Sequence, residues 1–238
     1  MYIKELERGA EETRIAQMLS TKELRTDTRN HSVPIIEVID DPEDDTISYM
    51  VMPLLRAADS PSFQFVKEII DFVDQILEVM GVVGWVFSRA DQVSGLGVLA
   101  RKRSRPSVLC DRHIVAAVAD ADPRDCVMHN LMMDADAMYP DGFHPVRTRW
   151  NRDYTDWATY VPRSAVGVRY YFVDFGISLH IPEHIRPKLA TGNLGRDHEP
   201  PELSVTVPYD PFKLDVFIIG NMFKHELYDV RPQLTVDP

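Results

Sequence analysis

Cysteine is scarce in this sequence: only Cys110 and Cys126 occur among its 238 residues. Two cysteines do not make the multi-bridge framework of small secreted domains, so a reducing compartment is the expected setting. The N-terminal stretch is charged and lacks the apolar core of a secretory signal. Three acidic residues interrupt the most apolar stretch, residues 69–87, which is too charged for a membrane span. These absences predict a cytoplasmic or nuclear protein that does not bind membranes.

Basic residues are the minority, with 26 Lys and Arg against 37 Asp and Glu and a formal net charge of -11. That balance argues against general binding to nucleic acids or to anionic membrane surfaces. The exception is a local basic cluster, Arg101–Arg105. The histidines show no metal-ligand spacing, and no internal repeat is present. The length allows one large domain or two small lobes with a shared core.

Hydrophobic periodicity predicts a mixture of helices and strands. A helix is expected over Glu11–Leu19, and a hairpin is expected from two β-rich runs, Val33–Asp40 and Ile47–Leu55, around the acidic turn Asp41–Asp45. The stretch 62–80 carries an apolar helical stripe, and this long buried helix should end near Met80. The stripe comprises Phe65, Ile69, Phe72, Val73, Ile76, Leu77 and Met80. Short strands are expected over 130–134 and 169–173, and a further apolar helix over 213–223.

Four short motifs follow one another in the second half of the chain. The first is "RDCVMHN", in which Asn130 lies five residues after Asp125. Next, the apolar strand "RYYFV" ends in Asp174-Phe175-Gly176. The third and fourth are Pro200-Pro201-Glu202 and the run from Asp215 to Gly220. In this order they resemble the large lobe of a protein kinase, most closely the kinase-like domains abundant in fungi.

The resemblance extends to the first half of the chain. "YIKEL" places Lys4 in a short strand, and "GAEETRIAQML" places Glu12 in the following helix, which resembles the ion pair that holds nucleotide phosphates. "ISYMVMPLL" resembles the strand that leads into the hinge between lobes. There Met52 would line the adenine pocket, while Pro53 and Leu55 would offer a backbone carbonyl and an N–H to the adenine edge.

The resemblance implies ATP and Mg²⁺ as ligands and a protein as the phosphoryl acceptor. Asp174 and Asn130 would bind Mg²⁺ through hard oxygen atoms. Asp125 would accept or orient the proton of the attacking hydroxyl. Lys4 would hold the nucleotide phosphates as a point charge. Asp125, Asn130 and Asp174 are therefore expected to converge on one cleft.

The implied fold is α+β and two-lobed, with an incomplete small β lobe and an incomplete, mainly helical large lobe. Residues 1–55 would form part of the N-lobe and the hinge, and 56–238 part of the C-lobe. Two segments, about 81–122 and 135–167, fit the pattern poorly and are expected to protrude or to be poorly ordered. The first of them, up to Pro123, is either a recent insertion or translated non-coding sequence, or a loop specific to its family.

Several positions depart from the kinase pattern. No glycine-rich loop precedes Lys4, Pro123 stands where the pattern has histidine, and Val127 stands where it commonly has a lysine. These departures predict weak, magnesium-dependent nucleotide binding and little phosphoryl transfer. Three functions therefore stay open: a protein kinase acting on Ser or Thr hydroxyls, a catalytically inactive binding module, and a small-molecule phosphotransferase.

Overall fold

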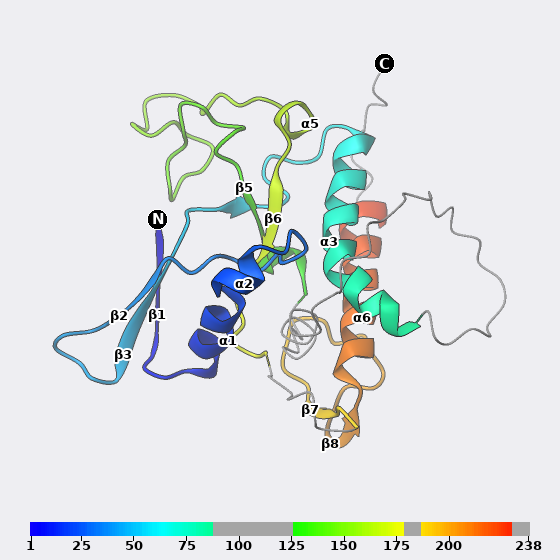
Figure 1. The fold of residues 1–238 in the computed structure, drawn as a ribbon. Helices are drawn as coiled ribbons and strands as arrows, with labels where there is room; N and C mark the ends of the chain where they lie inside the picture. The colour runs from blue at the N-terminus through cyan, green and yellow to red at the C-terminus, as the bar shows by residue number, and fades with distance from the viewer. Residues whose placement is uncertain (88–125, 179–186, 230–238) are drawn as a thin grey trace.

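A computed structural model describes residues 1–87, 126–178 and 187–229. The fold mixes helices with three small antiparallel sheets, so the α+β prediction is confirmed (Figure 1). Asp125, Pro123, the basic cluster 101–105 and most of the segment 81–122 lie outside the described residues. No helix in the described ranges is long and apolar enough to cross a membrane.

The first sheet has the strand order β1-β3-β2 and contains the predicted hairpin. Its strands are β1 (Tyr2–Glu7), β2 (Glu37–Asp40) and β3 (Ile47–Met52). The hairpin turn is closed by Asp41, whose carboxylate accepts the N–H groups of Glu43 and Asp44. Strand β2 begins four residues later than predicted, because Val33 donates its N–H to Phe172 instead of joining this sheet.

Helix α1 (Glu11–Leu19) follows β1 and matches its predicted bounds. Its apolar side chains Ile15 and Leu19 are fully buried, together with Met50 of β3. Residues that lie opposite one another in an antiparallel pair share a face, and the register pairs Lys4 with Met50. Lys4 therefore lies on the inner face of this sheet. A short helix, α2 (Lys22–Arg25), completes the turn that follows α1.

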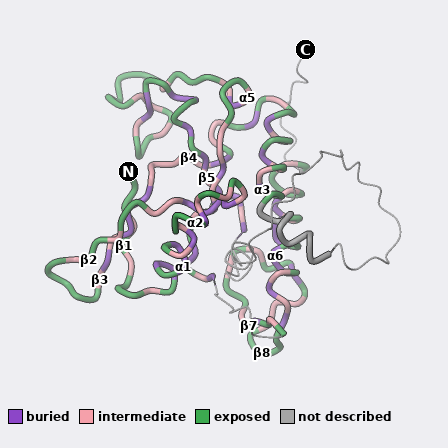
Figure 2. Tube along the Cα trace, in the orientation of Figure 1, coloured by how far each residue is buried: buried purple, intermediate pink, exposed green. Residues whose placement is uncertain are grey.

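The second sheet has the strand order β4-β5-β6. It lies among the buried segments at the centre of the described fold (Figure 2). It consists of β4 (Arg56–Ala57), β5 (Leu131–Asp134) and β6 (Arg169–Phe172). The last two strands lie close to the two short strands predicted. Leu131, Met133 and Tyr170 are fully buried. The chain at His31 runs beside β6 and accepts the N–H of Phe172 at 2.7 Å, which joins the N-terminal third of the chain to this sheet.

Two long helices and a third sheet complete the fold. Helix α3 (Val66–Phe87) runs seven residues past Met80, so the predicted end of this helix is wrong. The stripe is buried at Phe72 and Ile76, but Leu77 is 43% exposed. The remaining elements are α5 (Arg163–Val166), α6 (Pro211–Met222), the 3-10 turn η1 (Met128–Asn130), the π-helical η2 (Phe223–Asp229), β7 (Ala190–Gly192) and β8 (Ser204–Tyr209).

The N-terminus of each long helix is fixed by a carboxylate. The side chain of Glu68 accepts the N–H groups of Gln64 and Phe65, which explains why α3 starts at Val66 and not earlier. Asp210 accepts the N–H of Phe212 at the start of α6. Carboxylates in these positions satisfy backbone donors that have no partner inside the helix.

The prediction that the segment 135–167 protrudes is wrong for its first part, which packs into the core, whereas residues 144–162 are exposed or partly exposed. Met138 and Tyr139 are buried, and Val161 donates its N–H to Met138. Farther along, the Trp150 and Trp157 rings stack with their centroids 5.0 Å apart. Met138 and Tyr139 thus join the main hydrophobic core, whereas Trp157 stays 59% exposed, and the segment has almost no regular secondary structure.

Two buried arginines attach this segment to the second sheet. Arg56 donates to the carbonyls of Ser60 and Thr148, and burial lowers the pKa of its guanidinium. Arg163 donates to the carbonyls of Ala58 and Pro61, and it also donates to the hydroxyl of Tyr170. Among the described residues, neither arginine has a carboxylate within ion-pair distance. Each guanidinium group therefore donates hydrogen bonds to two backbone carbonyls instead of pairing with a carboxylate.

Replacing Arg163 with methionine is expected to lower the free energy of unfolding by about 2–4 kcal/mol, because three buried oxygen acceptors lose their donor. Chemical denaturation followed by circular dichroism measures this change. Arg149→Met is the matched control, since Arg149 is exposed in the same segment. Equal stabilities of the two variants would show that Arg163 does not hold this segment.

Candidate functional site

The candidate site is centred on Lys4, whose side chain reaches from β1 to two separate carboxylates. Its Nζ atom lies 2.6 Å from Oε1 of Glu12 on α1 and 3.1 Å from Oδ1 of Asp174, which follows β6. Glu12 and Asp174 are 8 and 170 residues away from Lys4 in the sequence. One cation thus connects the first sheet, the first helix and the end of the second sheet.

Glu12 is the buried member of this group, with 6% of its side chain exposed. The Oε1 atom that contacts Lys4 also accepts the backbone N–H of Phe175 at 3.2 Å. Its neighbour Glu11 is exposed and pairs with Arg14 instead. The helix phase explains this division, because Glu12 is on the same face as the buried Ile15 and Leu19, and Glu11 is on the solvent face.

Asp174 is held in an uncommon backbone conformation, with φ at 68°. Its Oδ1 atom accepts the N–H of Gly176 at 3.1 Å and also contacts Lys4. Asp and Asn adopt left-handed conformations more readily than other residues with a side chain, so this position suits an aspartate. A Cβ atom at Gly176 would lie 3.1 Å from Oδ1 of Asp174 and 3.4 Å from Oε2 of Glu12, so a larger residue would crowd both carboxylates.

The charges at the site stabilise one another. Burial disfavours the charged form of Lys4, but the Glu12 carboxylate and then Asp174 outweigh it and raise the pKa of the ammonium group above its usual value. Burial also opposes the charged form of Asp174. The Gly176 N–H and Lys4 reverse that effect and lower the pKa of its carboxyl. Lys4 and Asp174 are therefore both ionised near neutral pH.

Asn130 lies beside this group, at the same end of the second sheet. It ends the turn η1 directly before β5, and its carbonyl accepts the N–H of Val173 at 2.9 Å. That bond places Asn130 opposite the residue before Asp174, on the neighbouring strand. Asp125 is five residues upstream and outside the described residues, so its expected convergence with Asn130 and Asp174 stays a prediction.

The residues predicted for adenine recognition lie between the two sheets. Met52 ends β3 and is buried. Pro53 and Leu55 are partly exposed in the connection to β4. In the described part of the chain, neither the Pro53 carbonyl nor the Leu55 N–H makes a hydrogen bond. This connection therefore presents an acceptor and a donor on one short extended stretch.

Two contributors to the site were not assigned a role from the sequence, namely the N–H groups of Phe175 and Gly176. Both bind the carboxylates that flank Lys4. The sequence signal was the Asp-Phe-Gly motif itself, which identified the aspartate but not these backbone donors. Backbone hydrogen bonds of this kind depend on local dihedral angles, which residue types specify only in part.

Among the residues that the structure describes, the site has too few ligands to hold a metal ion with protein groups alone. In the ranges that the structure describes, no group of three or more His, Cys, Asp or Glu side chains is placed to hold one. Mg²⁺ in phosphate chemistry commonly takes one or two carboxylates, and the substrate phosphates supply further oxygens. Asp174 and Asn130 fit that smaller set. Comparison with protein-family models, curated proteins and solved structures found no match.

Proposed function

We propose that this chain is a protein-kinase-like phosphotransferase that transfers the γ-phosphoryl group of ATP to a Ser or Thr hydroxyl of a protein. The observation that supports this most directly is the position of Lys4 between Glu12 and Asp174. The first strand and the first helix meet a residue 170 positions away from Lys4 at one cation, beside an asparagine. This arrangement supports a two-lobed kinase-like fold, in which the first sheet and α1 belong to one lobe.

The chemistry of phosphoryl transfer explains the residue types at this site. The reaction requires mainly positioning and neutralisation of phosphate charge. Lys4 is held ready as a cation by Glu12, and Asp174 and Asn130 are the residues that would hold Mg²⁺. When bound, Mg²⁺ neutralises charge on the phosphates. Asp174 leaves 46% of its side chain exposed, so part of the carboxylate is accessible to a ligand.

The connection between the sheets supports a nucleotide as the phosphoryl donor. The Pro53 carbonyl and the Leu55 N–H match the donor and acceptor pattern of an adenine edge. Met52 would pack beside the ring, since its side chain is buried at the end of β3, on the same face of the sheet as Lys4. Pro53 lacks a backbone N–H, but this does not weaken adenine binding, because only its carbonyl would contact the ring.

A nucleotide-binding protein without transfer activity is the second candidate. Val127 favours it, because the kinase pattern commonly has a phosphate-binding lysine at this position. Pro123 replaces the histidine that would help to pack the catalytic loop. Both substitutions affect the loop around Asp125, and neither alters the Lys4, Glu12 and Asp174 group. Binding and transfer therefore need to be measured separately.

Glu12→Gln is expected to lower the rate of phosphoryl transfer about tenfold, because one charge-assisted hydrogen bond to Lys4 is replaced by a neutral one. Transfer from radiolabelled ATP to a degenerate Ser/Thr peptide library, with and without Mg²⁺, measures this rate. Glu11→Gln is the control, since Glu11 is one residue away and exposed. If the two variants transfer phosphate equally well, the ion pair has no part in the reaction.

A further inference from the structure

The first sheet has an outward face with an unusual composition. Residues opposite one another in the register share a face, so the side turned away from Lys4 carries eight side chains. They are Ile3, Glu5, Glu7, Glu37, Ile39, Ile47, Tyr49 and Val51. Four are aliphatic, one is tyrosine and three are glutamates. No lysine or arginine occupies an outward position on these three strands.

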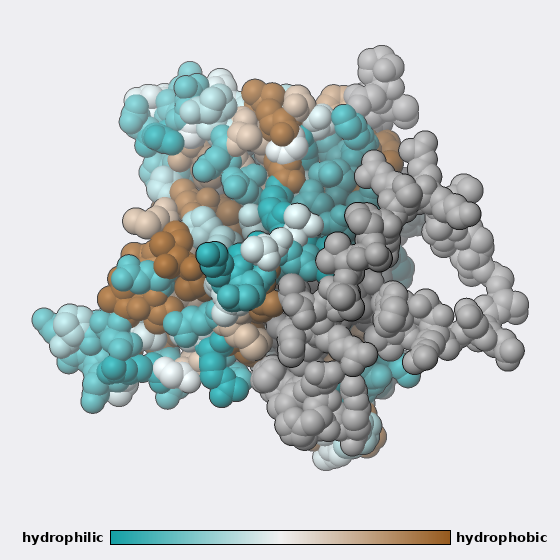
Figure 3. All heavy atoms as spheres, in the orientation of Figure 1, coloured by the Kyte–Doolittle hydropathy of each residue, from teal (hydrophilic) through white to brown (hydrophobic). Residues whose placement is uncertain are grey.

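Two isoleucines on this face are open to solvent. Ile3 is 59% exposed and Ile39 is 46% exposed, and Ile36 directly before β2 is exposed as well. Figure 3 shows hydrophobic surface gathered beside the N-terminal end of β1, next to hydrophilic surface over the β2–β3 hairpin. A sheet with one solvated face usually alternates apolar residues inward with polar residues outward. Val51 on this face is already buried, so Ile3 and Ile39 are the outward aliphatic side chains that need an explanation other than the core.

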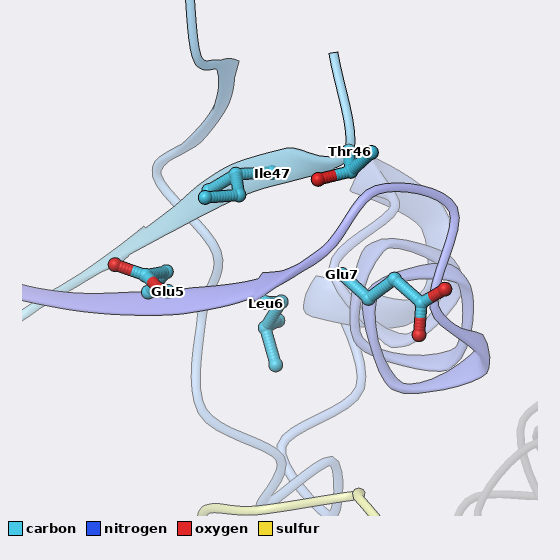
Figure 4. Close-up of a pocket in the computed structure, with 5 residues that line it drawn as sticks. All are labelled: Glu5, Leu6, Glu7, Thr46 and Ile47. Atoms are coloured by element: carbon cyan, nitrogen blue, oxygen red, sulfur yellow. The ribbon is translucent and has the colours of Figure 1, made fainter. Parts of the chain in front are cut away.

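A pocket opens on the same face. It has a volume of about 240 Å³ and is lined by Glu5, Leu6, Glu7, Thr46 and Ile47 (Figure 4). Three of these residues, Glu5, Glu7 and Ile47, are outward positions of the register. The volume is below the roughly 300–1,000 Å³ of small-molecule sites, which suits a single inserted side chain. Glu5 and Glu7 lie at opposite ends of the pocket and their carboxylates point apart (Figure 4), with the aliphatic side chain of Ile47 beside them. Each end thus suits the methylene stem and cationic end of a lysine or arginine.

We propose that this outward face, which we call the acidic face, binds a segment of a partner protein that combines aliphatic side chains with lysine or arginine. The aliphatic side chains would cover Ile3 and Ile39, and a basic side chain at the pocket would pair with Glu5 or Glu7. Among the described residues, the two cations of this part of the chain are paired elsewhere, Arg8 with Asp40 at 2.6 Å and Lys4 with Glu12 and Asp174 on the other face of the sheet. The glutamates thus remain available to charges from outside.

The negative charge of the acidic face argues against three other binding partners, namely a second copy of the chain, nucleic acid and an anionic membrane. Two copies of the chain meeting through the acidic face would bring like charges together, which disfavours self-association. Nucleic acid and anionic membranes are repelled for the same reason. The acidic face lies on the opposite side of the sheet from Lys4, so this inference is independent of the proposed phosphoryl transfer.

The probe is a short fluorescein-labelled peptide in which leucine and lysine alternate, and its binding is followed by fluorescence anisotropy. Combining Glu5→Lys with Glu7→Lys is expected to weaken binding at least about tenfold at low salt. The control combines Asp141→Lys with Asp153→Lys, which changes the net charge equally at two exposed positions of another segment. The control variant should bind like the original chain. Ile3→Ser should also weaken binding, whereas Ile70→Ser on the exposed side of α3 should not.

Three results would overturn the proposal. One is equal affinity of the Glu5 and Glu7 variant and its charge-matched control. Another is equal binding of a peptide in which glutamate replaces lysine. The third is a dimer in sedimentation experiments that Ile3→Ser dissociates, since the acidic face would then belong to a contact between copies of this chain. Circular dichroism confirms beforehand that each variant is folded.

Discussion

Replacing Asp174 with alanine is expected to weaken magnesium-dependent nucleotide binding at least about a hundredfold, because the site loses the only carboxylate assigned to Mg²⁺. Lys4 also loses one of its two anionic partners, 3.1 Å away. Isothermal titration calorimetry with ATP, in the presence and absence of Mg²⁺, measures the change. Unaltered affinity in the variant would mean that Asp174 is not part of a nucleotide site.

Alanine at this position has a second effect that must be separated from the first. Asp174 has φ at 68°, a conformation that alanine adopts at a higher cost than aspartate or asparagine. Asp174→Asn keeps the backbone preference and removes only the charge. This variant should therefore remain fully folded but bind ATP more weakly than the original chain. Asp153→Ala, at an exposed position of the segment 135–167, controls for the removal of an acidic residue.

Replacing Asp125 with asparagine is expected to reduce the rate of phosphoryl transfer by roughly 10²–10⁴-fold, since an amide cannot accept the proton of the attacking hydroxyl. ATP affinity should stay the same, because Lys4, Asn130 and Asp174 are unchanged. Single-turnover transfer measured next to calorimetry separates the two quantities. Asp153→Asn is the matched control.

This experiment also distinguishes the two candidate functions. A chain that binds ATP with Mg²⁺ but transfers no phosphate, before or after the Asp125 substitution, is a nucleotide-binding module. If the Asp125→Asn variant transfers phosphate as well as the original chain, the reaction uses a different base, and the assignment of the "RDCVMHN" loop would be wrong. Transfer that is lost while binding is retained supports the kinase proposal.

The sequence by itself determined the elements with strong local signals. The hairpin around the acidic turn, the helix Glu11–Leu19 and the strands β5 and β6 of the second sheet follow from hydrophobic periodicity and turn residues, which act within a few positions. The order of the motifs singled out Lys4, Glu12 and Asp174. The choice of Glu12 over Glu11 was possible because helical phase is readable from the sequence.

Only the tertiary structure decided how the segment 135–167 packs and which arginines are buried. Arg56 and Arg163 resemble surface residues in the sequence, and each has a carbonyl partner in a distant segment, 92 residues away for Arg56 and 105 for Arg163. The distance between Lys4 and Asp174 was likewise set by the docking of the first sheet against the second. The composition of the acidic face became visible only through strand register, because a shift by one residue would exchange the two faces of the sheet. Local sequence preferences fix helices and turns, whereas contacts between distant segments depend on how complete elements pack together.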